Sequence, residues 1–399
     1  MTEPEKANTE TPDGRTTSIK QLALLFFKLG VISFGGPAAH IAMMEDEVVR
    51  RRRWLSRDEF LDLLGATNLI PGPNSTEMAI HIGRQQAGWP GLLVAGSCFI
   101  LPATLIVTAL AWAYVRYGSL PQTDAILYGV KPAVIAIILQ ALWGLGRAAL
   151  KTKALALISV AGILLGFLGV HELVILFGAG GAIGFGSWVT NRMTRGGSFS
   201  HIPAAPLALL SKTVALTTQS AASFGLWPLF LFFLKVGSVL FGSGYVLLAF
   251  LRADLVERWR WLTESQLLDA ITAGQVTPGP VFTTATFIGY ILGGTRGALV
   301  ATVGIFIPAF FFVAVSGPLV SRIRRSATAG AVLDGINAAS LSLMAVVTWR
   351  LGWAALVDLT TVATLAVSLV LLIRFRINSA WLVLAAALFA FLVFAWNKI

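Results

Sequence analysis

Two proline-rich stretches decide how this chain folds: "NLIPGPNSTE" (Asn68–Glu77) and "QVTPGPVFTT" (Gln275–Thr284). Both lie within very hydrophobic sequence. Proline lacks an N–H and fixes φ, and the residue before a proline is pushed out of the helical region. Each Pro-Gly-Pro therefore ends one helix and lets another begin directly after it. The chain thus breaks its helices at two places and surrounds each break with hydroxyl and amide side chains.

The composition around these breaks is that of a protein with many membrane-spanning helices. Of the 399 residues, 56% are hydrophobic and 12% are charged, whereas a soluble globular protein carries about 25% charged residues. Several apolar runs reach the roughly 20 residues that a helix needs to cross the hydrocarbon layer, and they do not alternate as membrane strands do. The runs are Gly91–Tyr114, Ala125–Leu145, Ala154–Val170, Leu173–Val189, Pro228–Leu251, Gly297–Val315, Leu359–Ile373 and Ala380–Trp396.

The charged residues and the single cysteine exclude several function classes. The formal net charge is +11, but most basic residues lie in short loops between apolar runs, which indicates positive-inside topology rather than nucleic-acid binding. Cys98 is the one cysteine, so neither a disulfide nor a thiolate metal cluster can form within one chain. The sequence has no Walker A motif, no zinc-protease motif and no catalytic triad. We therefore expect no enzyme activity, no cofactor and no metal, and the N-terminus carries no cleavable signal pattern.

The chain contains two related halves. At a shift of 207 residues, Lys28 aligns with Lys235, Trp54 with Trp261, and the first Pro-Gly-Pro with the second. These residues do not share one register by chance, and internal repeats are frequent in secondary transporters. We predict a polar, disordered tail over 1–18, a first transporter repeat over 19–195, a linker over 196–206 and a second repeat over 207–399.

Loop charges predict that the halves have opposite orientations, because positively charged loops stay on the cytoplasmic side. The first loop of half one is rich in arginine over 50–53, whereas its counterpart mixes arginine with Asp254 and Glu257. The next long loop shows the opposite bias: half one has only Arg116 there, whereas half two has three arginines over 322–325.

We therefore predict an all-α polytopic membrane protein built as an inverted repeat, with about ten spanning helices and two re-entrant hairpins. The first helix of half one is expected to span and to end at Phe34-Gly35-Gly36. The arms of its hairpin are Leu55–Ile70 and Asn74–Ala87, each too short and too polar to span. Pro71-Gly72-Pro73 forms the tip of that hairpin.

The breaks predict one central site for a small anion. In lipid, free backbone groups are tolerated only inside protein or beside a watery cavity. The helix that starts after each break has unpartnered N–H groups and a positive dipole end, where anions bind well. A second pair of breaks, "SFGGPAAH" (Ser33–His40) and "FGSGYV" (Phe241–Val246), supplies glycines that let backbone approach a ligand closely. The candidate substrate-binding residues are Ser33, Phe34, Gly35, Gly36, Pro71, Gly72, Pro73, Asn74, Ser75, Thr76, Phe241, Gly242, Ser243, Pro278, Gly279, Pro280, Thr283 and Thr284.

The alternative is that these residues merely kink the helices, since Pro and Gly are common in transmembrane segments. Repetition of the whole motif at equivalent positions favours a site. A passive anion channel would use the same helix ends as a carrier, and the sequence leaves that choice open.

Four charged residues are candidates for a charge pathway or for coupling. Lys28 and Lys235 lie within the first helix of each half, where they either attract the anion or reach the interface by snorkelling. Arg84 follows the hairpin and is either part of the pathway or a loop cation. Glu77 is either an acid that favours the helix dipole or a proton-coupling carboxylate. His81 shares its helix face, where it either joins a proton relay or is simply hydrogen-bonded.

Three segments resemble the chromate ion transporter family in its long form, with both halves fused. They are "KLGVISFGGPAAHIAMMEDEVVRRRRWLSRDEFLDLLGATNLIPGPNSTEMAIHIG", "KVGSVLFGSGYVLLAFL" and "WLTESQLLDAITAGQVTPGPVFTTATFIGY". The resemblance covers nearly the whole chain. It implies a multi-pass secondary transporter that exports chromate across the bacterial inner membrane, driven by the proton motive force, and so confers chromate resistance. Sulfate is an isosteric dianion, so a transporter or channel for sulfate or another small oxyanion is the alternative. The partners implied are the oxyanion and the lipid bilayer, without nucleic acid, and a homodimer is compatible with the sequence.

Overall fold

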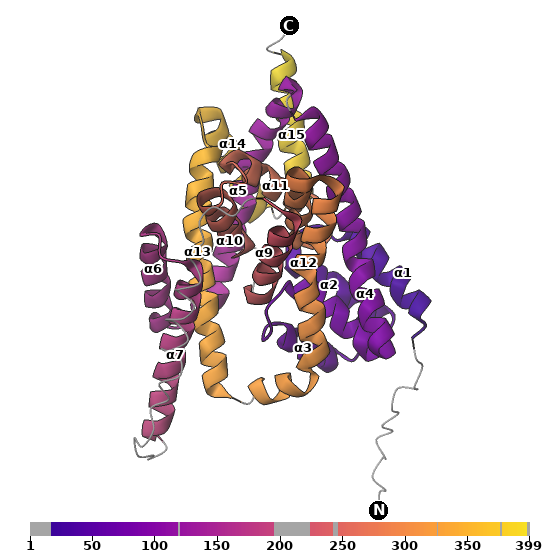
Figure 1. Ribbon diagram of the computed structural model, residues 1–399, viewed down its shortest axis with the longest axis vertical. Coiled ribbons are helices and arrows are strands. Elements are labelled where there is room, and N and C mark those ends of the chain that lie inside the picture. The colour runs from indigo at the N-terminus through magenta and orange to yellow at the C-terminus, as the bar shows by residue number, and fades with distance from the viewer. Residues whose placement is uncertain are drawn as a thin grey trace, which may run out of the picture.

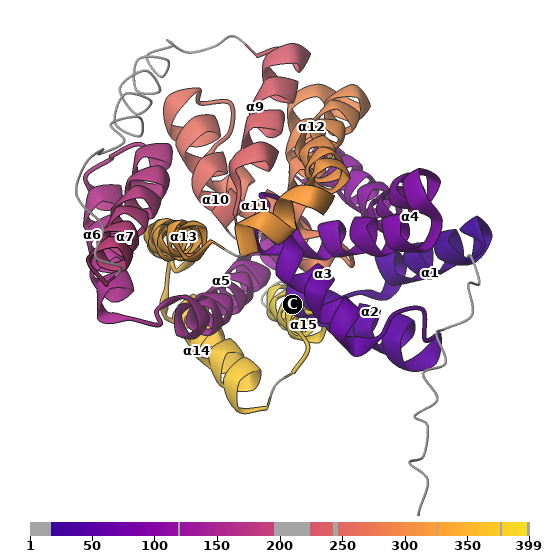
Figure 2. The ribbon, with the colours of Figure 1, turned by 90° about the horizontal axis from the view of Figure 1, so that it is seen from below.

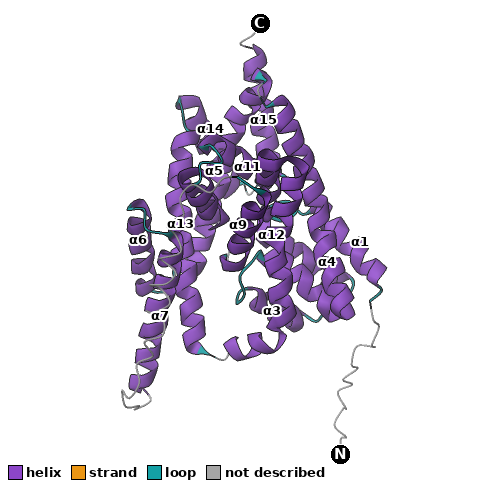
Figure 3. Cartoon of the chain, viewed as in Figure 1, coloured by secondary structure: helices purple, strands orange, loops and turns teal. Residues whose placement is uncertain are grey.

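The computed structural model describes residues 17–118, 120–194, 224–241, 246–324, 326–375 and 377–396. Within these ranges the chain is helical and contains no strand, as Figure 3 shows. Most of the predicted tail (1–16), the predicted linker (196–206) and two predicted site residues, Gly242 and Ser243, lie outside the described residues.

The helices follow the same order in both halves. The first half contains α1 (Ile19–Ile32), α2 (Gly36–Glu45), a π-helical segment (Asp46–Arg51), α3 (Arg57–Thr67), α4 (Asn74–Tyr117), α5 (Pro121–Ala149), α6 (Lys153–Phe167) and α7 (Glu172–Thr194). The second half contains α9 (Leu226–Val239), α10 (Leu247–Phe250), a π-helical segment (Leu251–Arg258), α11 (Glu264–Val276), a 3₁₀ turn (Val281–Thr283), α12 (Thr284–Arg324), α13 (Ala327–Ala355), α14 (Leu359–Arg374) and α15 (Ser379–Trp396).

Local backbone conformations repeat along with the helices. Arg53 and Arg260, at equivalent positions, both have positive φ, 52° and 55°. The helix before each Pro-Gly-Pro begins with a capping box: the Ser56 hydroxyl accepts from the Glu59 N–H in α3, and the Thr263 hydroxyl accepts from the Gln266 N–H in α11. The same start signal therefore places the same helix ahead of both breaks.

Each long helix after a Pro-Gly-Pro is sharply folded on itself. The helical path breaks at Ala87–Gly88 in α4 and at Gly293–Gly294 in α12. Residues eight apart in a straight helix are separated by about 12 Å along its axis. A Cβ built on Gly83 would nevertheless lie 2.3 Å from the carbonyl oxygen of Gly91. In each half the chain thus forms a helix, a Pro-Gly-Pro loop, a short helix and a tight bend in succession.

Several helices are long and apolar enough to cross a membrane. Among the described residues there are six: Asn74–Tyr117, Pro121–Ala149, Glu172–Thr190, Val281–Ser316, Thr328–Ala355 and Ser379–Trp396. The chain is therefore a multi-pass membrane protein. The helices expected to span first in each half, α1 and α9, have 14 residues each, which is short of the roughly 20 required. They end early because the chain breaks directly after them, at Ser33 and Leu240.

The two halves are interlocked (Figures 1 and 2). Helices α6 and α7 of the first half pack on α13 of the second, and α14 and α15 of the second half pack on α5 of the first. Helix α12 also packs against α4. In Figure 1, α15 leads up to the C-terminus at the top, whereas its counterpart α7 runs down to the lower left. Neither half is a separate globular unit, so a cavity between them is walled by both.

Candidate functional site

The two Pro-Gly-Pro loops meet the ends of the first helices crosswise. The Gly72 N–H donates to the Leu240 carbonyl oxygen, at 2.6 Å, and the Gly279 N–H donates to the Ser33 carbonyl oxygen, at 2.8 Å. Ser33 and Leu240 are equivalent residues that end α1 and α9. Each loop therefore pairs with the other half. The sequence predicts that the breaks expose N–H groups to a ligand, but these two N–H groups are bonded within the protein.

Both central positions of the loops require glycine. Gly72 has φ 141°, and a Cβ there would lie 2.2 Å from Glu77 Oε1. Gly279 has φ 89°, and a Cβ there would lie 2.7 Å from the Ala103 Cβ. Left-handed φ values disfavour any L side chain, and the neighbouring atoms leave no room for one.

Glu77 is fully buried, one turn after the first Pro-Gly-Pro. Neither of its carboxyl oxygens has a hydrogen-bond partner among the described residues. Its counterpart in the second half, Thr284, is equally buried, but its hydroxyl donates to the Val281 carbonyl oxygen at 2.8 Å. The Nε2 of His81 likewise has no partner within the described ranges. An unpartnered carboxylate is costly to bury, so Glu77 needs either a proton or a ligand that arrives from outside.

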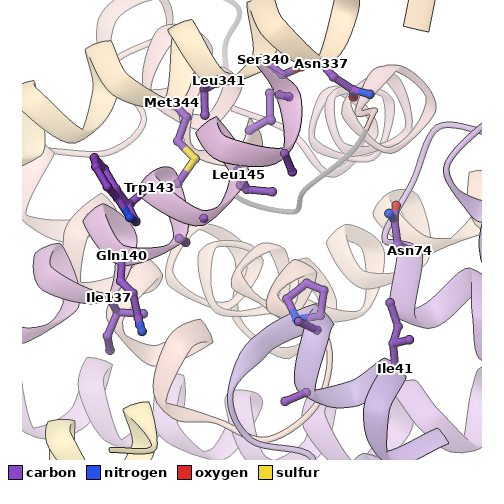
Figure 4. Close-up of a pocket in the computed structure, with 18 of the residues that line it drawn as sticks. Ile41, Asn74, Ile137, Gln140, Trp143, Leu145, Asn337, Ser340, Leu341 and Met344 are labelled. Atoms are coloured by element: carbon purple, nitrogen blue, oxygen red, sulfur yellow. The ribbon is translucent and has the colours of Figure 1, made fainter. Parts of the chain in front are cut away.

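A large cavity of about 1510 Å³ lies beside the crossed loops and is lined by both halves. Figure 4 shows Gln140 and Trp143 of α5 on one side of the cavity and Ile41 of α2 and Asn74 of α4 on the other. Four of the predicted site residues line it: Phe34, Gly35, Asn74 and Phe241. The other described members of that set do not line it: Ser33, Gly36, Pro71, Gly72, Pro73, Ser75, Thr76, Pro278, Gly279, Pro280, Thr283 and Thr284.

The polar part of the cavity wall consists mainly of carboxamides, which sequence reasoning missed. The cavity-lining polar residues besides Asn74 include Asn68, Gln140, Gln275, Asn337, Ser340 and Asn378. The lysine on the wall, Lys151, lies 3.2 Å from the Asp334 carboxylate. A sequence signal was available for one pair, because Asn68 and Gln275 occupy the same position three residues before each Pro-Gly-Pro.

The two predicted lysines form equivalent ion pairs. Lys28 Nζ lies 3.0 Å from Glu47 Oε1, and Lys235 Nζ lies 2.6 Å from Asp254 Oδ2. Both acids belong to the π-helical segments, and neither lysine lines the cavity. Each contact therefore ties the π-helical segment of one repeat to the first helix of that repeat, α1 or α9.

Arg84 joins the halves and is not a loop cation. Its Nη1 donates to the carbonyl oxygens of Val313 and Ala314 in α12, at 2.6 and 2.5 Å. Its guanidinium carbon also lies 5.2 Å from the centre of the Trp89 ring. The cation therefore anchors the bend of α4 on the second half.

A multi-pass helical chain with two repeats, crossed helix breaks and a large cavity lined by both repeats has the architecture of a membrane transporter. The chain belongs to the chromate transporter family: the family model described as "Chromate transporter" matches residues 20–185 and 227–391, one match in each half.

Curated relatives agree with this assignment over most of their length. A "Chromate transport protein" of Cupriavidus metallidurans is 30% identical over 93% of this chain and 92% of its own. A "Probable chromate transport protein" of Synechococcus elongatus is 32% identical, covering 86% and 87%. A "Chromate transport protein" of Pseudomonas aeruginosa is 33% identical, covering 86% and 84%. No solved structure matches the chain.

Proposed function

We propose that this protein is a secondary transporter that exports chromate across the cell inner membrane, is coupled to the proton motive force and confers chromate resistance. One observation carries the proposal: an open cavity lies beside the crossed helix breaks, and both repeats line it. Transporters place their substrate sites at such repeat interfaces, next to discontinuous helices. The names of the relatives supply chromate as the substrate.

The proposed architecture is an inverted repeat of 19–195 and 207–399 in which α3 and the first arm of α4 form a re-entrant hairpin, as do α11 and the first arm of α12. Opposite directions of α7 and α15 in Figure 1 support the inversion, as does the reversed arginine bias of the equivalent loops. The short helices α1 and α9 then enter the membrane part-way. The arginines over 50–53 lie in the cytoplasm and Arg258 on the opposite side.

In the proposed mechanism, the anion enters the cavity beside Asn74, at the start of α4, where the helix dipole favours negative charge. Glu77 lies one turn further along the same helix and has no protein partner in the described ranges. A dianion nearby favours a proton on this carboxyl, because adjacent like charges resist joint ionisation. Proton and anion are then linked at one place, as coupling requires.

The test is transport in everted membrane vesicles, with labelled chromate and sulfate compared. We expect chromate uptake that accelerates when the vesicle interior is made electrically positive and when the external medium, which bathes the cytoplasmic face, is made acidic, because the proton and the anion move together. We expect weaker uptake of sulfate. Uptake of sulfate in preference to chromate would favour the broader oxyanion transporter. Uptake that never exceeds equilibrium under a pH gradient would favour a channel. Vesicles that move neither anion would refute the proposed function.

A further inference from the structure

We propose that Asn68 and Gln275, one carboxamide from each repeat, are the side chains that recognise a tetrahedral dianion in the cavity. The proposal rests on the proposed transport function and names residues that determine its specificity. Both side chains line the cavity.

Symmetry singles out this pair among the cavity-lining residues. Asn68 and Gln275 are equivalent in the two repeats, and so are Phe34 and Phe241, which line the same cavity. Equivalent residues can line one space only where that space approaches the axis relating the repeats. The crossed bonds from Gly72 and Gly279 mark the same region, because each carboxamide is three residues before a Pro-Gly-Pro. The two amides therefore face one cavity, one from each repeat.

The hydrogen-bonding state of both amides favours an anion over a cation. Gln275 is only 9% exposed, and its Nε2 has no partner among the described residues. Asn68 Oδ1 accepts a hydrogen bond from Asn74 Nδ2 at 2.9 Å. This contact occupies the Asn68 oxygen and leaves its Nδ2 hydrogens for another acceptor. The pair thus offers N–H donors, which the oxygens of an oxyanion can accept.

Neutral donors suit a substrate that must be released. The lysine on the cavity wall, Lys151, is already paired with Asp334, and these side chains are 61% and 40% exposed. Binding through carboxamides and helix N-terminal dipoles stabilises the dianion without a fixed counter-charge that would hold it. Recognition then depends on how many donors reach the anion, so loss of either amide should weaken binding.

The experiment uses the full-length protein in proteoliposomes, with chromate transport measured as a function of chromate concentration. Asn68→Asp and Gln275→Glu each replace the donor nitrogen by an acceptor oxygen at almost unchanged size. Loss of a hydrogen bond to a charged ligand should raise the chromate KM about tenfold or more in each variant. The maximal rate should change less than KM, and Gln275→Asn, which keeps an amide, should restore part of the affinity.

Asn337→Asp is the matched control, because it places the same charge in the same cavity, on α13, at a residue that is not one of the symmetric pair. An equal KM increase in Asn337→Asp and Asn68→Asp would show that any added negative charge in the cavity weakens binding, and it would overturn the assignment.

Gln275→Leu is the second control, for the case in which a buried glutamate prevents folding. It removes the donor without adding charge. A wild-type KM in both Asn68→Asp and Gln275→Leu would overturn the proposal while leaving chromate transport intact. Wild-type protein that transports neither chromate nor sulfate would instead refute the proposed function itself.

Discussion

At the residue scale, the two repeats differ one turn after their Pro-Gly-Pro loops. Glu77 stands there in the first repeat without a partner among the described residues, and Thr284 stands there in the second with its hydroxyl bonded to Val281. Because the equivalent residue is a threonine, only the first repeat carries a group that can gain or lose a proton at this position. The Thr284 hydroxyl is satisfied by a carbonyl of its own repeat, whereas the Glu77 carboxyl needs a proton or a ligand that no described residue provides.

Replacing Glu77 by Gln should separate transport from proton coupling. The amide has almost the same size but cannot release a proton, so the linkage between proton and anion is removed. We expect counterflow of labelled chromate in vesicles to persist, while acceleration by a pH gradient disappears. Thr284→Ser serves as the control, because it keeps the hydroxyl and should retain that acceleration. Gradient-driven uptake at the wild-type rate in Glu77→Gln would exclude this carboxyl as the coupling group.

Gly72→Ala and Gly279→Ala should impair transport while leaving membrane insertion intact. Both residues have left-handed φ, and the added Cβ would lie 2.2 Å from Glu77 Oε1 or 2.7 Å from the Ala103 Cβ. Strained φ costs on the order of 1–3 kcal/mol per residue, and the crossed bond to the opposite repeat would be disturbed. Vesicle uptake and the amount of protein in the membrane check this together. Wild-type uptake in both variants would show that the crossed loops tolerate a side chain.

The sequence predicts these breaks but not their partners. Proline chemistry and the common register mark both Pro-Gly-Pro loops as helix ends, and the glycines at their centres as special. The hydrogen bond from the Gly72 N–H to Leu240 depends on how the two halves pack, and long apolar runs contain no information about which helix packs on which.

The sequence also does not predict the partner of Lys28. Glu47 comes within reach of Lys28 because a π-helical segment positions it, and such a segment has no simple sequence signal. Asn68 and Gln275 were visible as a repeated pair, but polar residues are ordinary at helix ends.

At the element scale, the tight bends of α4 and α12 bring the two arms of each helix into contact. In each, two glycines let the arms touch through backbone: Gly83 meets Gly91, and Gly289 meets Gly297. A Cβ on Gly289 would lie 2.3 Å from the Gly297 carbonyl oxygen. Real Cβ atoms do not approach oxygen that closely, so the arms would have to separate.

Gly83→Ala and Gly289→Ala should therefore destabilise the protein, even though alanine is the better helix former by about 1 kcal/mol. Overpacking of a close contact typically costs about 1–3 kcal/mol, which outweighs that gain. Thermal unfolding in detergent is the measurement, with a lower melting temperature expected for both variants. Gly178→Ala in α7 is the control, since a Cβ there meets nothing within 4 Å and should be neutral or slightly stabilising.

At the scale of the whole molecule, polar contacts tie the repeats together besides the packing of α6, α7, α14 and α15. Lys131 of α5 lies 2.9 Å from Asp269 Oδ1 of α11, and the Tyr114 hydroxyl donates to Asp269 Oδ2 at 2.9 Å. The Asp269 side chain is only 4% exposed and that of Lys131 only 18%. Helices α5 and α13 correspond at a shift of 206 residues, which places Asn337 opposite Lys131. The second repeat therefore has no lysine with which to form an equivalent ion pair.

Asp269→Asn should weaken the joint between the repeats. Removing one partner of a buried ion pair leaves the other charge uncompensated, at a cost of about 3–5 kcal/mol. Asp334→Asn is the matched control, because it breaks the exposed Lys151–Asp334 pair, whose side chains are 61% and 40% exposed. Such surface pairs contribute about 0–1 kcal/mol. Thermal unfolding should therefore separate the two variants clearly, and equal melting temperatures would show that Lys131–Asp269 is not a stabilising joint.

The orientation of the repeats gives the last prediction. If they are inverted, the equivalent residues Arg51 and Arg258 lie on opposite sides of the membrane, although each stands next to an acid in the same π-helical setting. Cysteine labelling can measure this directly, because Cys98 is the one native cysteine and Cys98→Ser removes the background. Arg51→Cys should react with a membrane-impermeant reagent in everted vesicles, and Arg258→Cys should react in intact cells. The Arg51 side chain is 64% exposed and that of Arg258 is 30% exposed, so both can be reached. Labelling of both cysteines from the same side would mean that the repeats are parallel and would refute the inverted architecture.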